Sequence, residues 1–130
     1  MKLRILCKSK IHRATVTGAD LHYIGSIGID AMLMRQADIV PGEQVSVWNI
    51  NNGQRIETYA IALPEGSGHV VVNGAAARHF QAGDAIIIAA FCVTDETVVP
   101  RMIAVDERNG FAYDLTDGEP DVAVGSTGDI

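Results

Sequence analysis

An Asn-Gly pair between two alternating segments is the feature that most constrains the fold of this chain. Asn52 and Gly53 separate residues 44–50 from residues 55–63, and both segments alternate apolar with polar side chains. Asparagine and glycine adopt the positive backbone angles of a tight two-residue turn, so this arrangement is the strongest short-range signal for a β-hairpin. We therefore predict two antiparallel strands over these residues.

The rest of the chain also favours strands. Hydrophobic residues make up 48% of the sequence and aromatic residues only 5%, and the aliphatic residues are largely β-branched. Apolar segments bounded by polar or glycine-containing breaks predict further strands over residues 3–7, 11–16, 69–73, 84–91 and 102–105. Residues 29–40 instead have apolar side chains at helical spacing behind Asp30, which can cap a helix. The sequence therefore predicts a mostly β fold with one or two short helices.

Residues 107–130 differ from the rest of the chain in charge and pattern. They contain six acidic residues and one arginine, so residues 1–106 carry only −1 of the total charge of −6. Hydrophobic periodicity also ends there, and glycines are frequent. We predict a single domain over residues 1–106, followed by an acidic, Gly-rich, mobile tail over residues 107–130. Without a basic surplus, the domain is not expected to bind nucleic acid.

Targeting and metal-binding signals are not found in the sequence. No apolar run approaches the length of a membrane span, and no signal-peptide pattern precedes the first predicted strand. Cys7 and Cys92 have neither the spacing of a disulfide framework nor that of a zinc site. We expect a cytoplasmic protein with two free thiols, no metal and no contact with membranes.

Gly25 and Ser26 lie between two apolar, strand-like segments. Glycine reaches backbone angles that other residues avoid, so the hydroxyl of the following serine can turn back toward the glycine carbonyl. Self-cleavage at this bond would need a fold that distorts the amide and stabilises an oxyanion. The alternative is an ordinary Gly-Ser turn. A nucleophile elbow is excluded, because Ile24 occupies the position of its first glycine.

A set of motifs in fixed order goes beyond these local patterns. It comprises Ile11-His12-Arg13-Ala14-Thr15-Val16-Thr17, Asp20-Leu21-His22-Tyr23, Gly25-Ser26, Trp48-Asn49, Asn52-Gly53, Thr58-Tyr59-Ala60-Ile61 and Asn73-Gly74-Ala75-Ala76-Ala77. With these motifs the chain resembles the pyruvoyl-dependent aspartate 1-decarboxylases from about Met1 to Asp106.

The resemblance implies a small double-psi β-barrel that forms a homotetramer. It implies a proenzyme that cuts itself between Gly25 and Ser26 and converts Ser26 into a covalent pyruvoyl group, in place of pyridoxal phosphate (PLP). The implied reaction is decarboxylation of L-aspartate to β-alanine and CO₂ through a Schiff base with this group. β-Alanine would then feed the biosynthesis of pantothenate and coenzyme A.

The resemblance also assigns roles to individual residues. Thr58 would stabilise the oxyanion during cleavage and contact substrate, and Tyr59 would protonate the carbanion left by CO₂. Because the two are adjacent on a predicted strand, they should point to opposite faces. Arg55 suits a bidentate contact with the substrate side-chain carboxylate. The remaining predicted site residues bind substrate with Arg55 (Lys10, Gly74, Ala75 and Ala76) or support the site (Asn73, Trp48 and His12).

Two other functions stay open at this stage. A processing-dead barrel that acts as a binding or scaffold module would keep the fold without cleavage, and a serine hydrolase would use Ser26 uncut. Taken singly, Lys10 is equally a solvated charge, Trp48 a core residue and Gly74 part of a turn. Gly28 is expected to add flexibility beside the cleavage bond. The sequence does not establish the efficiency of cleavage or the need for a maturation-promoting protein.

Overall fold

The computed structural model describes residues 1–115 of the chain. In this region the elements are, in chain order, β1 (Arg4–Thr15), β2 (Gly18–Asp20), β3 (Ser26–Asp30), α1 (Ala31–Ala37), β4 (Gln44–Asn49), β5 (Arg55–Leu63), β6 (Val70–Asn73), the 3-10 helix η1 (Gly74–His79), β7 (Ala85–Thr94), β8 (Arg101–Val105) and β9 (Phe111–Asp114).

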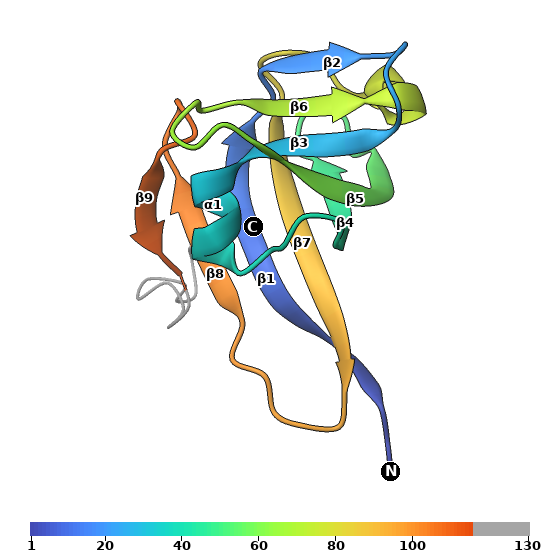
Figure 1. Ribbon diagram of the computed structural model, residues 1–130, viewed down its shortest axis with the longest axis vertical. Helices are drawn as coiled ribbons and strands as arrows, with labels where there is room; N and C mark the ends of the chain where they lie inside the picture. Colours follow the sequence, from blue (N-terminus) through green and yellow to red (C-terminus); the bar gives the residue numbers. More distant parts are fainter. Residues whose placement is uncertain (116–130) are drawn as a thin grey trace.

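These strands form one sheet in the order β2-β6-β3-β5-β4-β7-β1-β8-β9. Most neighbours are antiparallel, but β2 runs parallel to β6, β3 to β5 and β1 to β8. Figure 1 shows β2, β6 and β3 crossing the upper end of the molecule, while β1 and β7 form a long ribbon that descends toward the N-terminus. The predicted mostly β fold with one or two short helices is confirmed, and the curved sheet is consistent with a small β-barrel.

The core consists almost entirely of aliphatic side chains from the strands and from α1. Each buried side chain of this size contributes about 1.5–3 kcal/mol to folding. The largest fully buried ones are Ile11, Ile27, Ile29, Leu33, Ile86, Ile88, Ile103, Val16, Val45, Val47, Val70 and Val72. The predicted hairpin is confirmed as β4 and β5, with Trp48 opposite Arg55 and with Gly53 at a φ of +78° in the turn.

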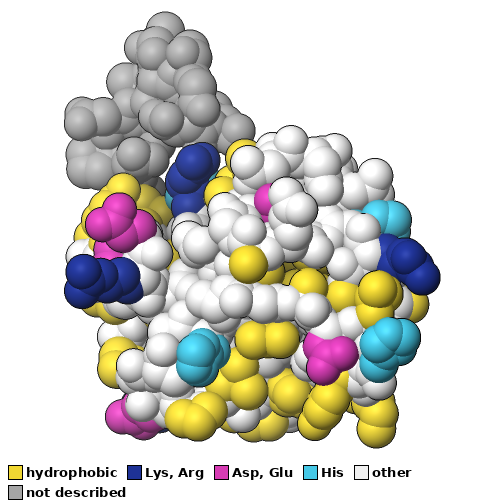
Figure 2. Space-filling view, turned by 90° about the horizontal axis from the view of Figure 1, so that it is seen from above, with side chains coloured by type: hydrophobic (Ala, Val, Ile, Leu, Met, Phe, Trp, Pro, Cys, Tyr) yellow, Lys and Arg dark blue, Asp and Glu magenta, His cyan; other side chains and the backbone are white. Residues whose placement is uncertain are grey.

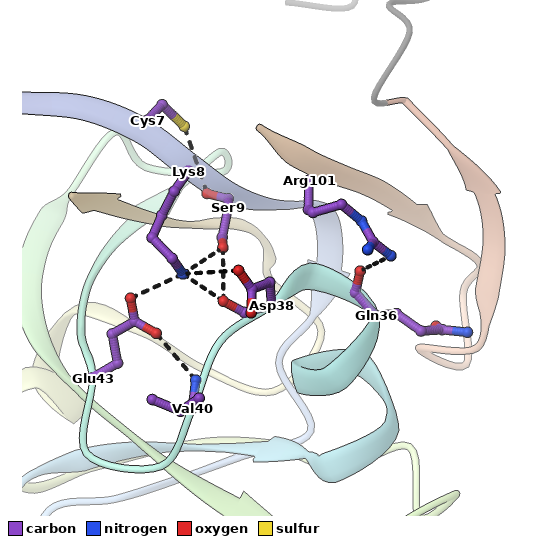
Figure 3. A network of polar contacts seen from close by, with 8 residues as sticks. All are labelled: Cys7, Lys8, Ser9, Gln36, Asp38, Val40, Glu43 and Arg101. Carbon is purple, nitrogen blue, oxygen red and sulfur yellow. Dashed lines mark hydrogen bonds and ion pairs between the residues drawn. The ribbon is translucent and has the colours of Figure 1, made fainter. Parts of the chain in front are cut away.

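The predicted break between two N-terminal strands is wrong. β1 is continuous over Arg4–Thr15, and the polar residues sit at an irregularity in its pairing with β7 between Cys7 and Ser9. The break in register turns Lys8 toward the end of α1. Its Nζ lies 2.9 Å from Ser9 Oγ and 3.0 Å from Glu43 Oε2 and also donates to the Asp38 carbonyl (Figure 3). Lys8 therefore joins β1 to the last turn of α1.

The predicted N-cap of the helix is confirmed. The Asp30 carboxylate is buried and accepts hydrogen bonds from the backbone N–H groups of Met32 (2.9 Å), Gly66 (3.0 Å) and Gly68 (2.9 Å). Burial by itself would raise the pKa of Asp30, but these hydrogen bonds outweigh it, and the net pKa is lowered. One carboxylate thus anchors both α1 and the loop before β6.

The C-terminal segment corrects the sequence prediction for residues 107–115. β9 pairs with β8, so β8 is not an edge strand, and Asn109 is buried. The Asn109 side chain accepts a hydrogen bond from Thr15 N (2.7 Å) and donates to the Thr15 and Gly68 carbonyls (both 2.8 Å). The ordered domain therefore extends past Asp106. The remainder of the predicted tail, residues 116–130, lies outside the described residues.

Candidate active site

Ser26 is the first residue of β3 and lies at the inner end of an exposed loop. Its side chain is buried at 2% exposure, whereas residues 21–25 before it are exposed and belong to no strand or helix. Ser26 is paired with Asn73 of β6, and Asn73 Nδ2 donates a hydrogen bond of 3.1 Å to Ser26 Oγ. This hydrogen bond thus holds the serine hydroxyl at the start of β3, in the residue that directly follows Gly25.

Asn73 is followed directly by η1, which begins with the predicted segment Gly74, Ala75 and Ala76. Gly74 is buried and has a φ of +77°, a conformation that favours glycine. Ala75 is exposed and Ala76 is half-buried, so η1 begins with three residues that have no side-chain atom beyond Cβ. The structure therefore places four of the predicted site residues, Ser26, Asn73, Gly74 and Gly25, side by side.

Two glycine predictions need correction. Gly25 does not adopt a positive φ and has room for a side chain, since a Cβ atom there would come no closer than 4.0 Å to the Asn73 carbonyl oxygen. Gly28 is buried within β3 and pairs with both Ile61 and Val71, so it adds no flexibility. A Cβ atom on Gly28 would instead lie 2.8 Å from Leu63 Cδ1.

Thr58 and Tyr59 lie in β5, which pairs in parallel with β3, the strand that begins with Ser26. Ile27 pairs with Ala60, so the residues before them, Ser26 and Tyr59, lie at the same level of the sheet. The regular alternation of β5 leaves Thr58 half-buried and Tyr59 exposed at 41%, which confirms that the two side chains point to opposite faces. The side chains can therefore serve different steps of a reaction.

A second group of predicted residues lies on the outer face of the sheet. His12, Trp48 and Arg55 occur in one cross-strand row through β1, β7, β4 and β5, and Lys10 lies in the next row. The Arg55 guanidinium stacks over the Trp48 ring at 4.4 Å from its centroid. A cleft of about 390 Å³ opens here, lined by Ser46, Trp48, Arg55, Ile56, Glu57 and Phe91.

The two groups are separated along β5. Arg55 lies four residues before Tyr59, which corresponds to about 13 Å of strand. Within one chain, the structure brings Thr58, Tyr59, Asn73 and Gly74 to Ser26, but it does not bring Lys10, His12 or Trp48 there. Sequence reasoning missed this division, because it depends on the register of strands that are distant in sequence.

The surface around the loop of residues 21–25 is rich in apolar groups. Figure 2 shows the upper face of the molecule, where apolar side chains gather over a broad area together with histidine and acidic side chains. In the loop before Ser26, Leu21, Tyr23 and Ile24 are exposed at 39%, 57% and 78%. Within residues 1–115, no group of three or more His, Cys, Asp or Glu side chains is arranged to hold a metal, and no helix has the length and hydropathy of a membrane span.

Comparison with known proteins identifies relatives over nearly all of the described region. A family model described as Aspartate decarboxylase matches residues 1–112. The aspartate 1-decarboxylase of Moorella thermoacetica is 58% identical over 110 residues, which cover 82% of this chain and 86% of the relative. The aspartate 1-decarboxylase of Syntrophotalea carbinolica is 53% identical, and the match covers 84% of this chain and 86% of the relative. That of Thermoanaerobacter pseudethanolicus is 54% identical, and the match covers 82% of this chain and 94% of the relative.

Proposed function

This chain belongs to the aspartate decarboxylase family, and we propose from this premise that it cuts itself between Gly25 and Ser26 and then decarboxylates L-aspartate to β-alanine and CO₂. The observation that carries the proposal is the buried Ser26 hydroxyl, fixed by Asn73 at 3.1 Å directly after an exposed loop. A serine hydrolase would instead keep Ser26 in an uncut chain, so the state of the Gly25–Ser26 bond separates the two functions.

The residues around Ser26 fit its conversion into the pyruvoyl group on which the family depends. Asn73 holds the hydroxyl, and Gly74, which has no side chain, lies against the backbone of Gly25. The group supplies a ketone that accepts the electrons released when CO₂ leaves the α-carbon. Serine alone has no such electron sink, so the self-cleavage is required for decarboxylation.

Thr58 and Tyr59 are proposed to serve the two reactions separately. Thr58 precedes Tyr59 in β5 as Gly25 precedes Ser26 before the parallel strand β3, and the Thr58 hydroxyl would donate a hydrogen bond to the oxyanion that forms on the Gly25 carbonyl during cleavage. Tyr59 is on the exposed face of β5. A phenol is protonated at neutral pH and can give its proton to a much stronger base, such as the carbanion left after CO₂ departs.

Arg55 is proposed to bind the side-chain carboxylate of aspartate. Its guanidinium is oriented by stacking on Trp48 at 4.4 Å, which leaves its planar edge available for a bidentate contact. If Arg55 held the α-carboxylate instead, it would stabilise the charge that disperses in the transition state and would oppose the reaction. Lys10 lies one row away on the same face of the sheet, outside the lining of the cleft, and is proposed to assist Arg55 in binding aspartate.

We further propose that the protein is a homotetramer in which the outer face of one protomer completes the site at Ser26 of a neighbour. The division of the predicted residues into two groups within one chain supports this arrangement. It would bring Arg55, Lys10, His12 and Trp48 to the face of Ser26 without any change in the fold. The proposed setting is the cytoplasm, where β-alanine would enter pantothenate and coenzyme A synthesis.

Intact-mass measurement tests the proposal directly. We expect the purified wild-type chain to convert on warming into fragments 1–25 and 26–130, with the larger fragment lacking a free N-terminal amine. Ser26→Ala should remain one chain and release no CO₂ from aspartate. A wild-type chain that stays intact would instead support a processing-dead binding module, unless an added maturation-promoting protein restores cleavage.

A further inference from the structure

Gly74 packs directly against the backbone of Gly25, the residue on the N-terminal side of the bond to be cut. A Cβ atom at position 74 would lie 2.6 Å from Gly25 Cα, 2.9 Å from Gly25 N and 3.3 Å from the Tyr23 carbonyl oxygen. The first two distances are shorter than any ordinary carbon contact. All three atoms belong to the backbone, so no rotation of a side chain could make room.

The loop that ends at the proposed cleavage bond, residues 21–25, is here called the cleavage loop. Within residues 1–115, its other backbone contacts are few. Within the loop, His22 N donates to Asp20 Oδ1 at 3.0 Å, and Tyr23 N approaches the Asp20 carbonyl at 3.4 Å. Both contacts are local, and neither fixes the distance between Gly25 and the end of β6. That distance is set by the pairing of Ser26 with Asn73 and by the contact between Gly74 and Gly25, where the two backbones meet without an intervening side chain.

We infer that Gly74 is a positioning residue for self-cleavage, in addition to any contact with substrate; this inference rests on the proposed function. In the first step Ser26 Oγ bonds to the Gly25 carbonyl carbon, the amide bond from that carbon to Ser26 N breaks, and the hydroxyl proton passes to the released nitrogen. Asn73 positions the attacking oxygen and Gly74, the next residue, positions the carbonyl. A displacement of about 1 Å can slow such a reaction on the order of 100-fold.

The chain offers a matched control for the backbone conformation. Gly53, in the β4–β5 turn, has a φ of +78°, almost the same as the +77° of Gly74, but no atom lies within 4 Å of the Cβ position at Gly53. Gly53→Ala and Gly74→Ala therefore both place alanine in a left-handed conformation. Only Gly74→Ala also pushes against the cleavage loop.

The experiment follows cleavage of the full-length wild-type, Gly74→Ala and Gly53→Ala chains by intact mass, with thermal unfolding measured in parallel. We expect Gly53→Ala to cleave at the wild-type rate and Gly74→Ala to cleave on the order of 100-fold more slowly. Hydroxylamine, which cuts esters, should not accelerate cleavage of Gly74→Ala, because its ester does not form. Gly74→Asn provides a second variant if alanine prevents folding, since asparagine tolerates a positive φ better.

If Gly74→Ala cleaves as fast as Gly53→Ala, the inference is overturned. If the cleaved Gly74→Ala protein also fails to form β-alanine, Gly74 is a substrate contact only. Rapid hydroxylamine cleavage of Gly74→Ala would also overturn the inference, because the first step would then be intact. If the wild-type and Gly53→Ala chains both stay whole, even after addition of a maturation-promoting protein, the proposed function itself fails.

Discussion

At the scale of single residues, Thr58 and Tyr59 offer the clearest separation of the two proposed reactions. They are adjacent in β5 but face opposite sides, with Thr58 half-buried and Tyr59 exposed. We expect Tyr59→Phe to cleave normally at Gly25 and to lose most β-alanine formation, because only the proton donor is missing. Thr58→Ala should remain uncut, since the oxyanion loses its donor, a change that typically costs 100- to 1,000-fold in rate, about 2.7–4 kcal/mol.

Intact mass and CO₂ release on both variants would decide this prediction. Tyr59→Phe with wild-type turnover would exclude the phenol as the essential proton donor, and normal cleavage of Thr58→Ala would exclude the hydroxyl from the first reaction.

The sequence could identify these residues but not all of their geometry. The sequence predicts that exposed and less exposed side chains alternate along β5, because this follows from the strand period and the Asn-Gly turn. It does not predict the contact between Gly74 and Gly25, because this contact depends on the antiparallel register of β3 and β6, which are far apart in sequence. The sequence motif points to Gly25, whereas the positive φ and the close backbone contact occur at Gly74.

At the scale of elements, Asp30 links α1 to the loop before β6 and makes stability depend on pH. The net pKa of its buried carboxyl is lowered, so the charged form stabilises the fold above the pKa of the unfolded chain. This contribution is lost as the pH falls through the lower pKa of the folded state, that is, below about pH 4. We expect Asp30→Asn to be less stable at neutral pH and to lose less further stability on acidification.

Urea unfolding of the wild type and Asp30→Asn at about pH 7, pH 5 and pH 3 would measure this difference. Asp95, an exposed carboxylate between β7 and β8, gives the control as Asp95→Asn. Parallel stability curves for the wild type and Asp30→Asn would contradict the prediction.

Asn109 makes a second element-scale link, which sequence patterns did not reveal. An acidic, glycine-rich segment without periodicity normally indicates disorder, yet one buried amide ties residues 107–110 to β1 and to the loop at Gly68. Asn109→Gly can keep the φ of +62° and loses only the side-chain hydrogen bonds. We expect it to reduce the free energy of unfolding by about 1–3 kcal/mol.

Chain truncation provides the companion measurement. Deletion of residues 110–130 removes β9 and the contact of Gly110 N with Asp106, so it should lower the midpoint of thermal unfolding. Deletion of residues 116–130 keeps every described contact and should leave the midpoint unchanged. Equal stability of the two truncated chains, or of Asn109→Gly and the wild type, would show that the C-terminal segment contributes little to the fold.

At the scale of the whole molecule, the predicted site residues lie in two separate regions of one chain. We therefore propose that two chains together form one active site. Ser26, Thr58 and Asn73 meet at the end of β3, whereas Arg55 and Lys10 lie on the outer face of the sheet. A domain of this size has a small interior, and the cleft at Trp48 and Arg55 is open at the surface. A symmetric oligomer can close such clefts, because each protomer presents both surfaces.

Subunit complementation tests this division. Ser26→Ala lacks the cleavage nucleophile, and Arg55→Gln should cleave but lose a charged contact with aspartate worth about 1.5–3 kcal/mol. Each variant alone is expected to be nearly inactive. If Ser26 and Arg55 act across an interface, co-expression of the two should restore about a quarter of the wild-type activity, because random mixing leaves that share of sites with both native residues. Differently tagged chains would establish that mixed assemblies form, and a chain carrying both substitutions, co-expressed with Ser26→Ala, is the inactive control. Mixed assemblies without recovered activity would place Arg55 and Ser26 of one chain in the same site.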